Sequence, residues 1–277
     1  MAASVGKVAP FESGRRLCLL FQSGSGRYAV EATSVTEVAP PDEDGHSIRG
    51  SLELHDLSVM LGGAPEVRPG MGLVLDVSPT LAVRIREVQE VADVSRDPFF
   101  LLPPIVGEAA ALIFRAAILH EGKLYLELIA DMLPQVQGLK FAGPARPVLV
   151  ADEVPDRALV FESQGRLFGI PLGLVSQVVS QGGAFCALPL SSGPAPGLFP
   201  HAQVLWPIYS VPGLMGGEAP AEELFVLAEL AGQNIGLCAS RALGVHQGFK
   251  ASDASGEFAT PSLPSPVLFL DLQRMFS

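Results

Sequence analysis

The feature that most constrains the fold of this chain is an internal repeat. Residues 19–23, Leu-Leu-Phe-Gln-Ser, are nearly copied by residues 159–163, Leu-Val-Phe-Glu-Ser, and the offset of 140 continues without a gap to Val38 and Val178. Later matches have offsets of 152 (residues 73–75 with 225–227) and 144 (residues 126–128 with 270–272), so the copies differ mainly in loop length. The repeat predicts two domains of one fold.

Within each copy the pattern is typical of β-structure. Short runs of valine, leucine, isoleucine and phenylalanine are separated by glycine, proline, serine and aspartate at strand-like intervals. Residues 23–26 and 163–166 lie between two such runs, as hairpin turns do. Residues 30–38 and 170–178 allow a helical turn after the second strand. Because many short strands would leave exposed edges, closed or nearly closed barrels are expected.

A linker is expected between the two copies. Residues 134–156 contain prolines at positions 134, 144, 147 and 155, which keep a segment extended and poorly helical. The predicted organisation is an N-terminal tail (1–15), a first domain (16–136), a proline-rich linker (137–156) and a second, more divergent domain (157–277).

Charge and composition narrow the class of protein. The net charge of −11 disfavours binding to nucleic acid and to anionic membrane surfaces. Charged residues make up 17% of the chain, against an ordinary fraction of about 25%, which leaves apolar surface for interfaces.

Cys18, Cys186 and Cys238 lack C-x-x-C spacing and fit reduced, buried thiols. With no apolar run near the ~18–20 residues of a membrane span, a cytoplasmic protein is predicted.

Motifs for catalysis or cofactor binding are weak. The five histidines, His46, His55, His120, His201 and His246, never show the i, i+4 spacing of metal ligands on a helix. The segment Glu53-Leu54-His55-Asp56 is interpreted as a solvated strand. No glycine-rich phosphate loop or nucleophile elbow is present. We therefore expect no enzymatic activity, no cofactor and no metal. Trp206 is expected in the core, with a role as partner anchor as the alternative.

The order of the segments makes each half resemble a CheW domain, the chemotaxis coupling module. In the first copy the resemblance is carried by residues 19–21, 28–30, 35, 37–38, 48–50, 56–57, 61–62, 73–75, 82–85, 87–88, 90–91 and 126–128. In the second copy it is carried by residues 159–161, 168–170, 175, 178, 207, 214–216, 225–227, 235–238, 245 and 270–272. Each motif is loose, but the ordered set occurs twice.

The resemblance implies an all-β fold in which each domain is a pair of small five-stranded SH3-like barrels with minor helix and a groove between them. It implies a non-enzymatic adaptor that couples chemoreceptor tip helices, or other signalling proteins, to the regulatory domain of a histidine kinase. Self-association stays open. One alternative is a divergent regulator in which one domain caps or inhibits the other, and another is an enzyme with a site between barrels. The residues expected at partner contacts are Val35, Glu37, Val38, Arg49, Gly50, Asp56, Val83, Ile85, Val88, Val175, Val178 and Trp206.

The chain also departs from the family pattern. The segment 51–55, between Arg49-Gly50 and Asp56-Leu57, is two residues short and lacks the usual proline, and Arg84 and Arg86 lie in a strand that is usually apolar and ends in Asp. In the second copy His201-Ala202 or Gln203 stands in place of Arg-Gly, and Ser210-Val211 in place of Asp-Leu. Unequal partner binding by the two halves is therefore predicted, with Arg49 contributing in the first.

Overall fold

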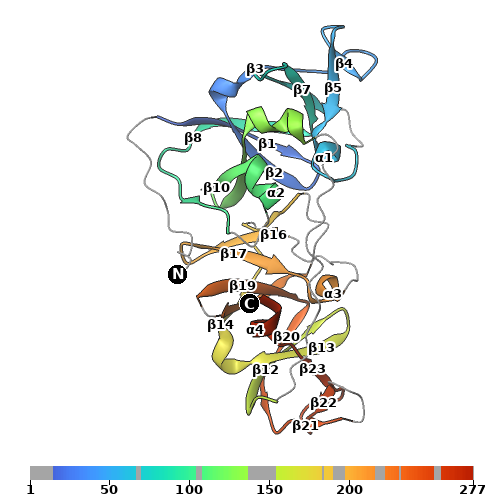
Figure 1. The fold of residues 1–277 in the computed structure, drawn as a ribbon, viewed down its shortest axis with the longest axis vertical. Helices are drawn as coiled ribbons and strands as arrows, with labels where there is room; N and C mark the ends of the chain where they lie inside the picture. Colours follow the sequence, from blue (N-terminus) through green and yellow to red (C-terminus); the bar gives the residue numbers. More distant parts are fainter. Residues whose placement is uncertain are drawn as a thin grey trace.

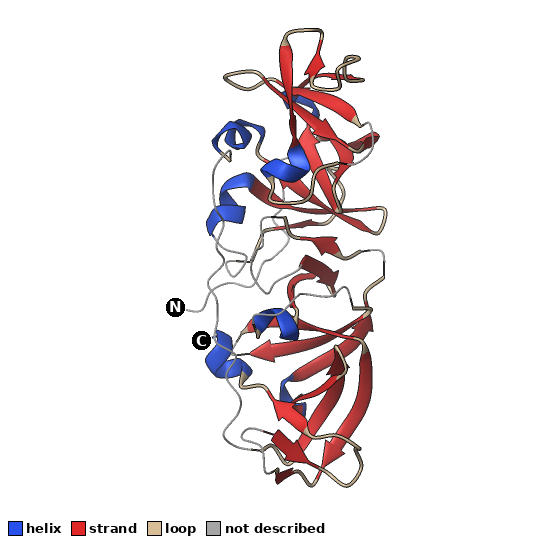
Figure 2. Cartoon of the chain, turned by 90° about the vertical axis from the view of Figure 1, so that its right-hand side faces the viewer, coloured by secondary structure: helices blue, strands red, loops and turns tan. Residues whose placement is uncertain are grey.

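The computed structural model describes residues 15–66, 70–103, 108–136, 154–182, 184–189, 197–215, 222–230, 232–252 and 257–276. Most of the predicted tail and of the predicted linker lies outside these residues. We call residues 15–136 the first domain and residues 154–276 the second domain; they occupy opposite ends of an elongated molecule (Figure 1). Strands dominate, and most of the short helices lie toward one side (Figure 2).

The first domain has two sheets. Their strands are β1 (Leu17–Ser23), β2 (Gly26–Glu31), β3 (Val35–Ala39), β4 (Ser47–Ile48), β5 (Leu52–Asp56), β6 (Met71–Leu75), β7 (Leu81–Ile85), β8 (Glu87–Asp93), β9 (Phe99–Phe100), β10 (Phe114–His120) and β11 (Lys123–Leu128). One sheet has the order β8-β1-β2-β11-β10-β9 and the other β3-β6-β7-β5-β4.

The second domain repeats this plan. Its strands are β12 (Arg157–Ser163), β13 (Arg166–Pro171), β14 (Val175–Ser180), β15 (Cys186–Ala187), β16 (Gly197–His201), β17 (Val204–Tyr209), β18 (Leu224–Leu230), β19 (Gln233–Ala239), β20 (Arg241–Gln247), β21 (Lys250–Ala251), β22 (Glu257–Ala259) and β23 (Val267–Phe269). The sheet orders are β20-β12-β13-β23-β22-β21 and β14-β18-β19-β17-β16-β15.

The two domains share connectivity and irregularities. Strands β1 and β12 have a register shift at the same place, between Leu20 and Phe21 and between Val160 and Phe161. The last described strand of each domain pairs in parallel with the second strand, β11 with β2 and β23 with β13. The predicted all-β fold is therefore confirmed. Within the described residues the sheets have six, five, six and six strands where five were expected in each, because the two-residue strands β9, β15 and β21 extend three of the edges.

Helices are short in the part of the chain that the structure describes. The predicted helical turn after the second strand is present in both domains as the 3-10 turns η1 (Ala32–Ser34) and η4 (Leu172–Leu174). The others are α1 (Leu57–Met60), α2 (Glu108–Ile113), η3 (Ala130–Gln135), α3 (Val211–Leu214) and α4 (Leu272–Phe276). Among these residues there is no helix with the length and apolar character needed to cross a membrane.

The repeated motif supplies the same aromatic pair to both cores. Phe21 lies opposite Tyr28 across the β1–β2 hairpin with ring centroids 5.8 Å apart, and Phe161 lies opposite Phe168 at 6.0 Å. All four side chains are buried. Burying a side chain of this size contributes about 1.5–3 kcal/mol, which explains why these positions carry the clearest part of the sequence repeat.

The two domains are in contact through a segment that the first domain lacks. Strand β15 of the second domain lies against β2 and β11 of the first. Arg27 Nη2 donates to the Phe185 carbonyl oxygen at 2.5 Å, and the Cys186 thiol is 3.9 Å from the Arg27 carbonyl oxygen. The largest buried cluster joins first-domain residues to four side chains of the second domain, Cys186, Leu188, Leu198 and Leu205. Strands β16 and β17 accordingly lie next to the first domain in Figure 1.

Candidate partner-binding site

The first domain has a pocket of about 550 Å³ where its two sheets meet. The β1–β2 turn contributes Gly24 and Ser25 from one sheet. Ser58 of α1, which follows β5 of the other sheet, contributes a second wall. Residues 63–66 and Arg86, which connects β7 to β8, complete the lining. The pocket is therefore lined by residues associated with both sheets of the first domain.

Two glycines make the close packing beside the pocket possible. A Cβ atom at Gly24 or at Gly63 would lie 2.6 Å from the Ser58 hydroxyl oxygen. Gly24 also has φ +56°, in the left-handed region that favours glycine. The serine- and glycine-rich turn seen in the sequence thus serves to bring one sheet's hairpin against the helix of the other.

Glu66 connects the walls of the pocket. Its carboxylate, 3% exposed, accepts a hydrogen bond from the Gly24 backbone N–H and one from Arg86 Nε at 3.3 Å. The Glu66 backbone N–H donates to Asp56 Oδ2 at 2.9 Å. Asp56 Oδ1 also accepts from the Val59 backbone N–H at 3.2 Å and caps α1. Asp56, predicted as a partner contact, therefore has a structural role at the pocket.

The second domain has the same arrangement of a helix-capping residue and a buried glutamate, but it lacks the arginine. Ser210 takes the capping role of Asp56, because its hydroxyl accepts from the Gly213 N–H at 3.2 Å at the start of α3. Glu222 takes the role of Glu66, accepting from the Ser163 hydroxyl at 2.8 Å and from the Gln164 N–H at 3.2 Å. Burial raises the pKa of Glu222 above its ordinary value, although both hydrogen bonds act in the opposite direction.

Backbone hydrogen bonds identify the counterpart of Arg86. Its N–H donates to the Gln22 carbonyl oxygen at 2.8 Å, and the N–H of Ser240 donates to the Glu162 carbonyl oxygen at the same distance. Serine therefore replaces arginine at this position of the second domain.

The turn at Arg49-Gly50 is defined by two positive φ angles, 55° and 66°. Asp42 supports it by accepting from the Arg49 N–H at 3.2 Å and from the Gly50 N–H at 2.6 Å. The Arg49 side chain is 70% exposed and pairs with Glu37 at 2.9 Å, which brings two of the predicted contact residues together. In the second domain Ala202 and Gln203 have φ 48° and 62°, so these two residues stand at the equivalent turn.

The remaining predicted contact residues are in or near the cores. Val83 and Ile85 are 0% exposed, so their side chains are unavailable to a partner in this structure, because β7 is the central strand of its sheet. Trp206 is 4% exposed, and its Nε1 donates to the His201 carbonyl oxygen at 3.3 Å, as expected of a core tryptophan. The half-buried valines Val35, Val38 and Val88 pack on the first core, and Val175 and Val178 on the second.

Sequence reasoning did not select the pocket residues Gly24, Ser58, Glu66 and Arg86. Two features of the sequence marked this region, namely the Ser-Gly-Ser-Gly turn and the unexpected Arg86, which directly follows β7. Glu66 carried no local signal, because its importance arises from a hydrogen bond to a turn 42 residues earlier in the chain.

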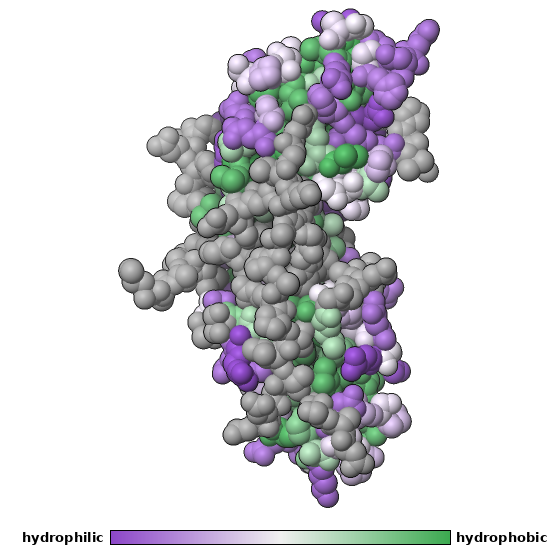
Figure 3. Space-filling view, turned by 45° about the vertical axis from the view of Figure 1, so that its right-hand side comes forward, coloured by the Kyte–Doolittle hydropathy of each residue, from purple (hydrophilic) through white to green (hydrophobic). Residues whose placement is uncertain are grey.

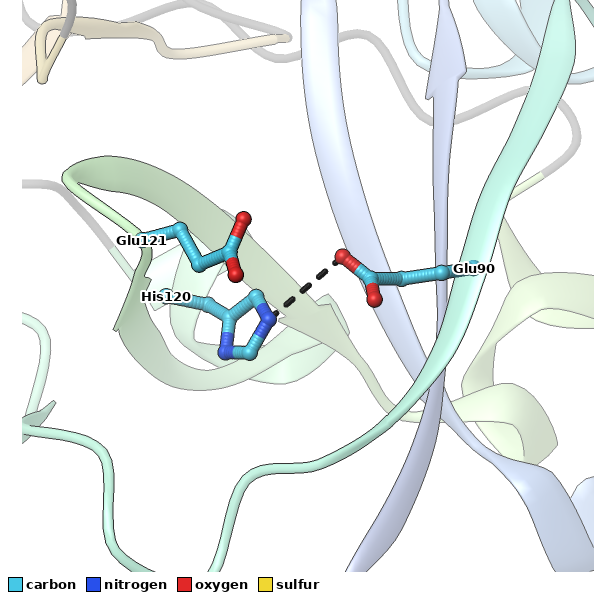
Figure 4. Close-up of side chains that lie close together, drawn as sticks. All are labelled: Glu90, His120 and Glu121. Carbon is cyan, nitrogen blue, oxygen red and sulfur yellow. Dashed lines mark ion pairs between the residues drawn. The ribbon is translucent and has the colours of Figure 1, made fainter.

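One group of side chains in the described residues has the spacing of metal ligands. The possible ligand atoms of Glu90, His120 and Glu121 lie within 4.8 Å of one another, and the side chains converge in Figure 4. His120 Nε2 is 3.4 Å from Glu90 Oε1, and Nδ1 is 2.6 Å from Asp97 Oδ2. Burial lowers the pKa of His120, but Asp97, Glu90 and Glu121 together outweigh it and raise this pKa. We interpret the group as ion pairs that hold β8 against the β10–β11 hairpin.

Comparisons with known proteins find similarity at the level of structure. No protein-family model matches the chain, and no curated protein matches it. Among solved structures, it is similar to the scaffolding protein TtCheW from Thermoanaerobacter tengcongensis, with a TM-score of 0.37 and 15% sequence identity. The match covers 45% of this chain and 94% of that protein.

Proposed function

We propose that this chain is a non-enzymatic adaptor of a chemosensory or related motility pathway. It would couple chemoreceptors or other signalling proteins to the regulatory domain of a histidine kinase. The domains would be residues 16–136 and 157–277, acting in the cytoplasm. The observation that supports the proposal is the pocket between the two sheets of the first domain, since the resemblance implies docking in a groove between paired β-structures.

The described surface of the molecule and the lining of the pocket both suit protein docking. Hydrophobic and hydrophilic residues alternate in small patches on the described part of the face in Figure 3. Interfaces that form and dissociate combine apolar contacts with a polar rim in this manner. The lining of turn backbone, alanine, proline, a buried carboxylate and an arginine offers shape and hydrogen bonds to a protein segment.

Copurification of the tagged full chain from its native cell, followed by mass spectrometry, tests the proposal. A histidine kinase or a chemoreceptor should be enriched relative to cells that carry the tag alone. Recovery of neither class, under conditions in which the tagged chain is folded and abundant, would contradict the adaptor role.

A second candidate function is regulation by capping, and the contact between the domains favours it. Strand β15 lies against β2 and β11 in the first domain, and the Cys186 and Arg27 contacts hold it there. In this alternative the second domain limits access to the first. Variants that weaken this contact should then increase partner binding by the full chain.

A further inference from the structure

We infer that the pocket of the first domain binds a carboxylate, supplied by an acidic side chain of a partner protein, through Arg86. The inference rests on the proposed function, because it names the chemistry by which that docking site selects its partner. It is drawn from the donors of Arg86, from a buried serine next to the pocket and from the equivalent residues of the second domain.

Arg86 has unused hydrogen-bonding capacity. Its side chain lines the pocket and is 44% exposed, and within the described residues only Nε is engaged, by Glu66 at 3.3 Å. A guanidinium has five N–H donors in a planar fork. The terminal nitrogens can therefore receive a second carboxylate in the paired geometry that makes arginine selective for this group.

The second domain shows how the equivalent serine and glutamate are hydrogen-bonded when the arginine is replaced. There Glu222 accepts a hydrogen bond from Ser163, whereas Ser23 at the equivalent position is 1% exposed and its hydroxyl has no partner in the described structure. An unpaired buried hydroxyl is costly. A ligand carboxylate that binds the terminal nitrogens and draws Arg86 away from Glu66 would leave Glu66 Oε2 free to accept from Ser23, as Glu222 Oε2 does from Ser163.

Pocket size and charge limit the ligand. A volume of about 550 Å³ accommodates an acidic side chain with the neighbouring residues of its peptide. Arg86 is the only cationic side chain among the described lining residues. Because the chain carries a net charge of −11, its long-range field repels anions. Recognition of the carboxylate must then depend on direct contact with Arg86 rather than on long-range electrostatic attraction of the ligand.

The test uses the full chain with ¹⁵N-labelled arginine and follows the Arg86 Nε–H resonance by NMR. The probes are a 12-residue peptide of alanine and glutamine with one central glutamate, the same peptide with a central glutamine, and sodium acetate. Arg86→Ser copies the second domain and assigns the resonance, Arg86→Lys keeps the charge without the fork, and Arg96→Ser is a control at another exposed arginine.

The glutamate peptide should shift the Arg86 resonance, with affinity about tenfold or more above that of the glutamine peptide. Arg86→Ser should lose this preference, Arg86→Lys should keep part of it, and Arg96→Ser should behave as the parent chain. Equal binding of the two peptides, or an unchanged preference in Arg86→Ser measured by titration calorimetry, would overturn the inference. Acetate binding as tight as that of the glutamate peptide would overturn the assignment to a protein segment.

These outcomes are separable from the adaptor role. Copurification of a kinase or receptor together with failure of the peptide would refute the carboxylate site alone. Peptide binding without either partner in copurification would refute the adaptor role and leave the carboxylate site standing.

Discussion

Ser23 and Ser163 occupy the same place in the two domains but differ in hydrogen bonding. Both are buried, yet Ser163 donates to Glu222 at 2.8 Å and Ser23 has no partner in the described structure. Removing a hydroxyl that serves a buried carboxylate costs about 1–3 kcal/mol, whereas removing an unpaired hydroxyl is neutral or stabilising.

Ser163→Ala should therefore lower the free energy of unfolding of the second domain by about 1–3 kcal/mol, and Ser23→Ala should leave that of the first domain unchanged or raised. Urea unfolding measures both effects, because Trp206 is the only tryptophan and its fluorescence follows the second domain, while circular dichroism follows the whole chain. Equal losses from the two substitutions would mean that Ser23 has a partner of its own.

Arg49→Ala tests the predicted partner contact at the other turn. Since Arg49 is 70% exposed and its pair with Glu37 is a surface ion pair, the substitution should change stability by no more than about 1 kcal/mol. If Arg49 contacts a partner, binding to the copurified kinase or receptor should weaken by about 1–3 kcal/mol. Arg96→Ala, at an exposed arginine away from this turn, serves as the control. A fall in melting temperature that accounts for the lost binding would assign Arg49 a structural role instead.

At the scale of elements, both domains share a connection between a hairpin and a distant acidic residue. Glu66 and Glu222 each accept from a backbone N–H of the hairpin between the first two strands of its domain, the N–H of Gly24 or of Gln164. In each domain a single carboxylate thereby joins the hairpin turn to the segment that precedes a later strand, β6 in the first domain and β18 in the second. The two sites differ in charge balance, because Arg86 accompanies Glu66 and Ser240 replaces it in the second domain.

This difference predicts a pH dependence. Burial raises the pKa of Glu222, so the folded chain holds this proton more tightly than the unfolded chain does. The stabilising effect of the proton is complete below the ordinary glutamate pKa and is lost as pH rises through the raised value. Glu222→Gln should therefore reduce the loss of stability with rising pH in that window, in urea unfolding followed by Trp206 fluorescence. Parallel pH profiles for the variant and the parent chain would contradict the raised pKa.

At the scale of the whole molecule, the contact between domains determines how independently the two halves act. It depends on an element of only two residues, β15, and on the Arg27 side chain. Cys186 lies at this contact, and burial raises the pKa of its thiol to about 11, which makes it unreactive at neutral pH. Cys18 and Cys238 are also buried, but each lies in a separate cluster.

Arg27→Ala should loosen the contact, because it removes the donor to the Phe185 carbonyl oxygen. The rate of Cys186 alkylation by iodoacetamide in the folded chain should then rise about tenfold or more, corresponding to about 1.4 kcal/mol less protection, while Cys18 and Cys238 remain protected. Peptide mass spectrometry identifies the labelled cysteine. Arg166→Ala, which removes an exposed arginine from the hairpin of the second domain, is the matched control. Equal labelling of all three cysteines would indicate global unfolding rather than separation of the domains.

The sequence alone determined the repeat and the all-β fold, because both depend on local patterns of apolar and turn-forming residues. The buried Phe21–Tyr28 and Phe161–Phe168 pairs and the 3-10 turns follow from the same local patterns. It also singled out the dipeptide Arg49-Gly50, and the two positive φ angles found there are properties of adjacent residues.

Only the tertiary structure decided which side chains share a site. Glu66 reaches Gly24 across 42 residues, Glu90 of β8 lies beside His120 at the end of β10, and Cys186 contacts Arg27 of the other domain. Val83 and Ile85 show the converse, since a motif placed them in a contact strand and the central position of β7 buried them. The physical reason is that strand order and loop closure bring these groups together, and neither is encoded in the spacing of the residues concerned.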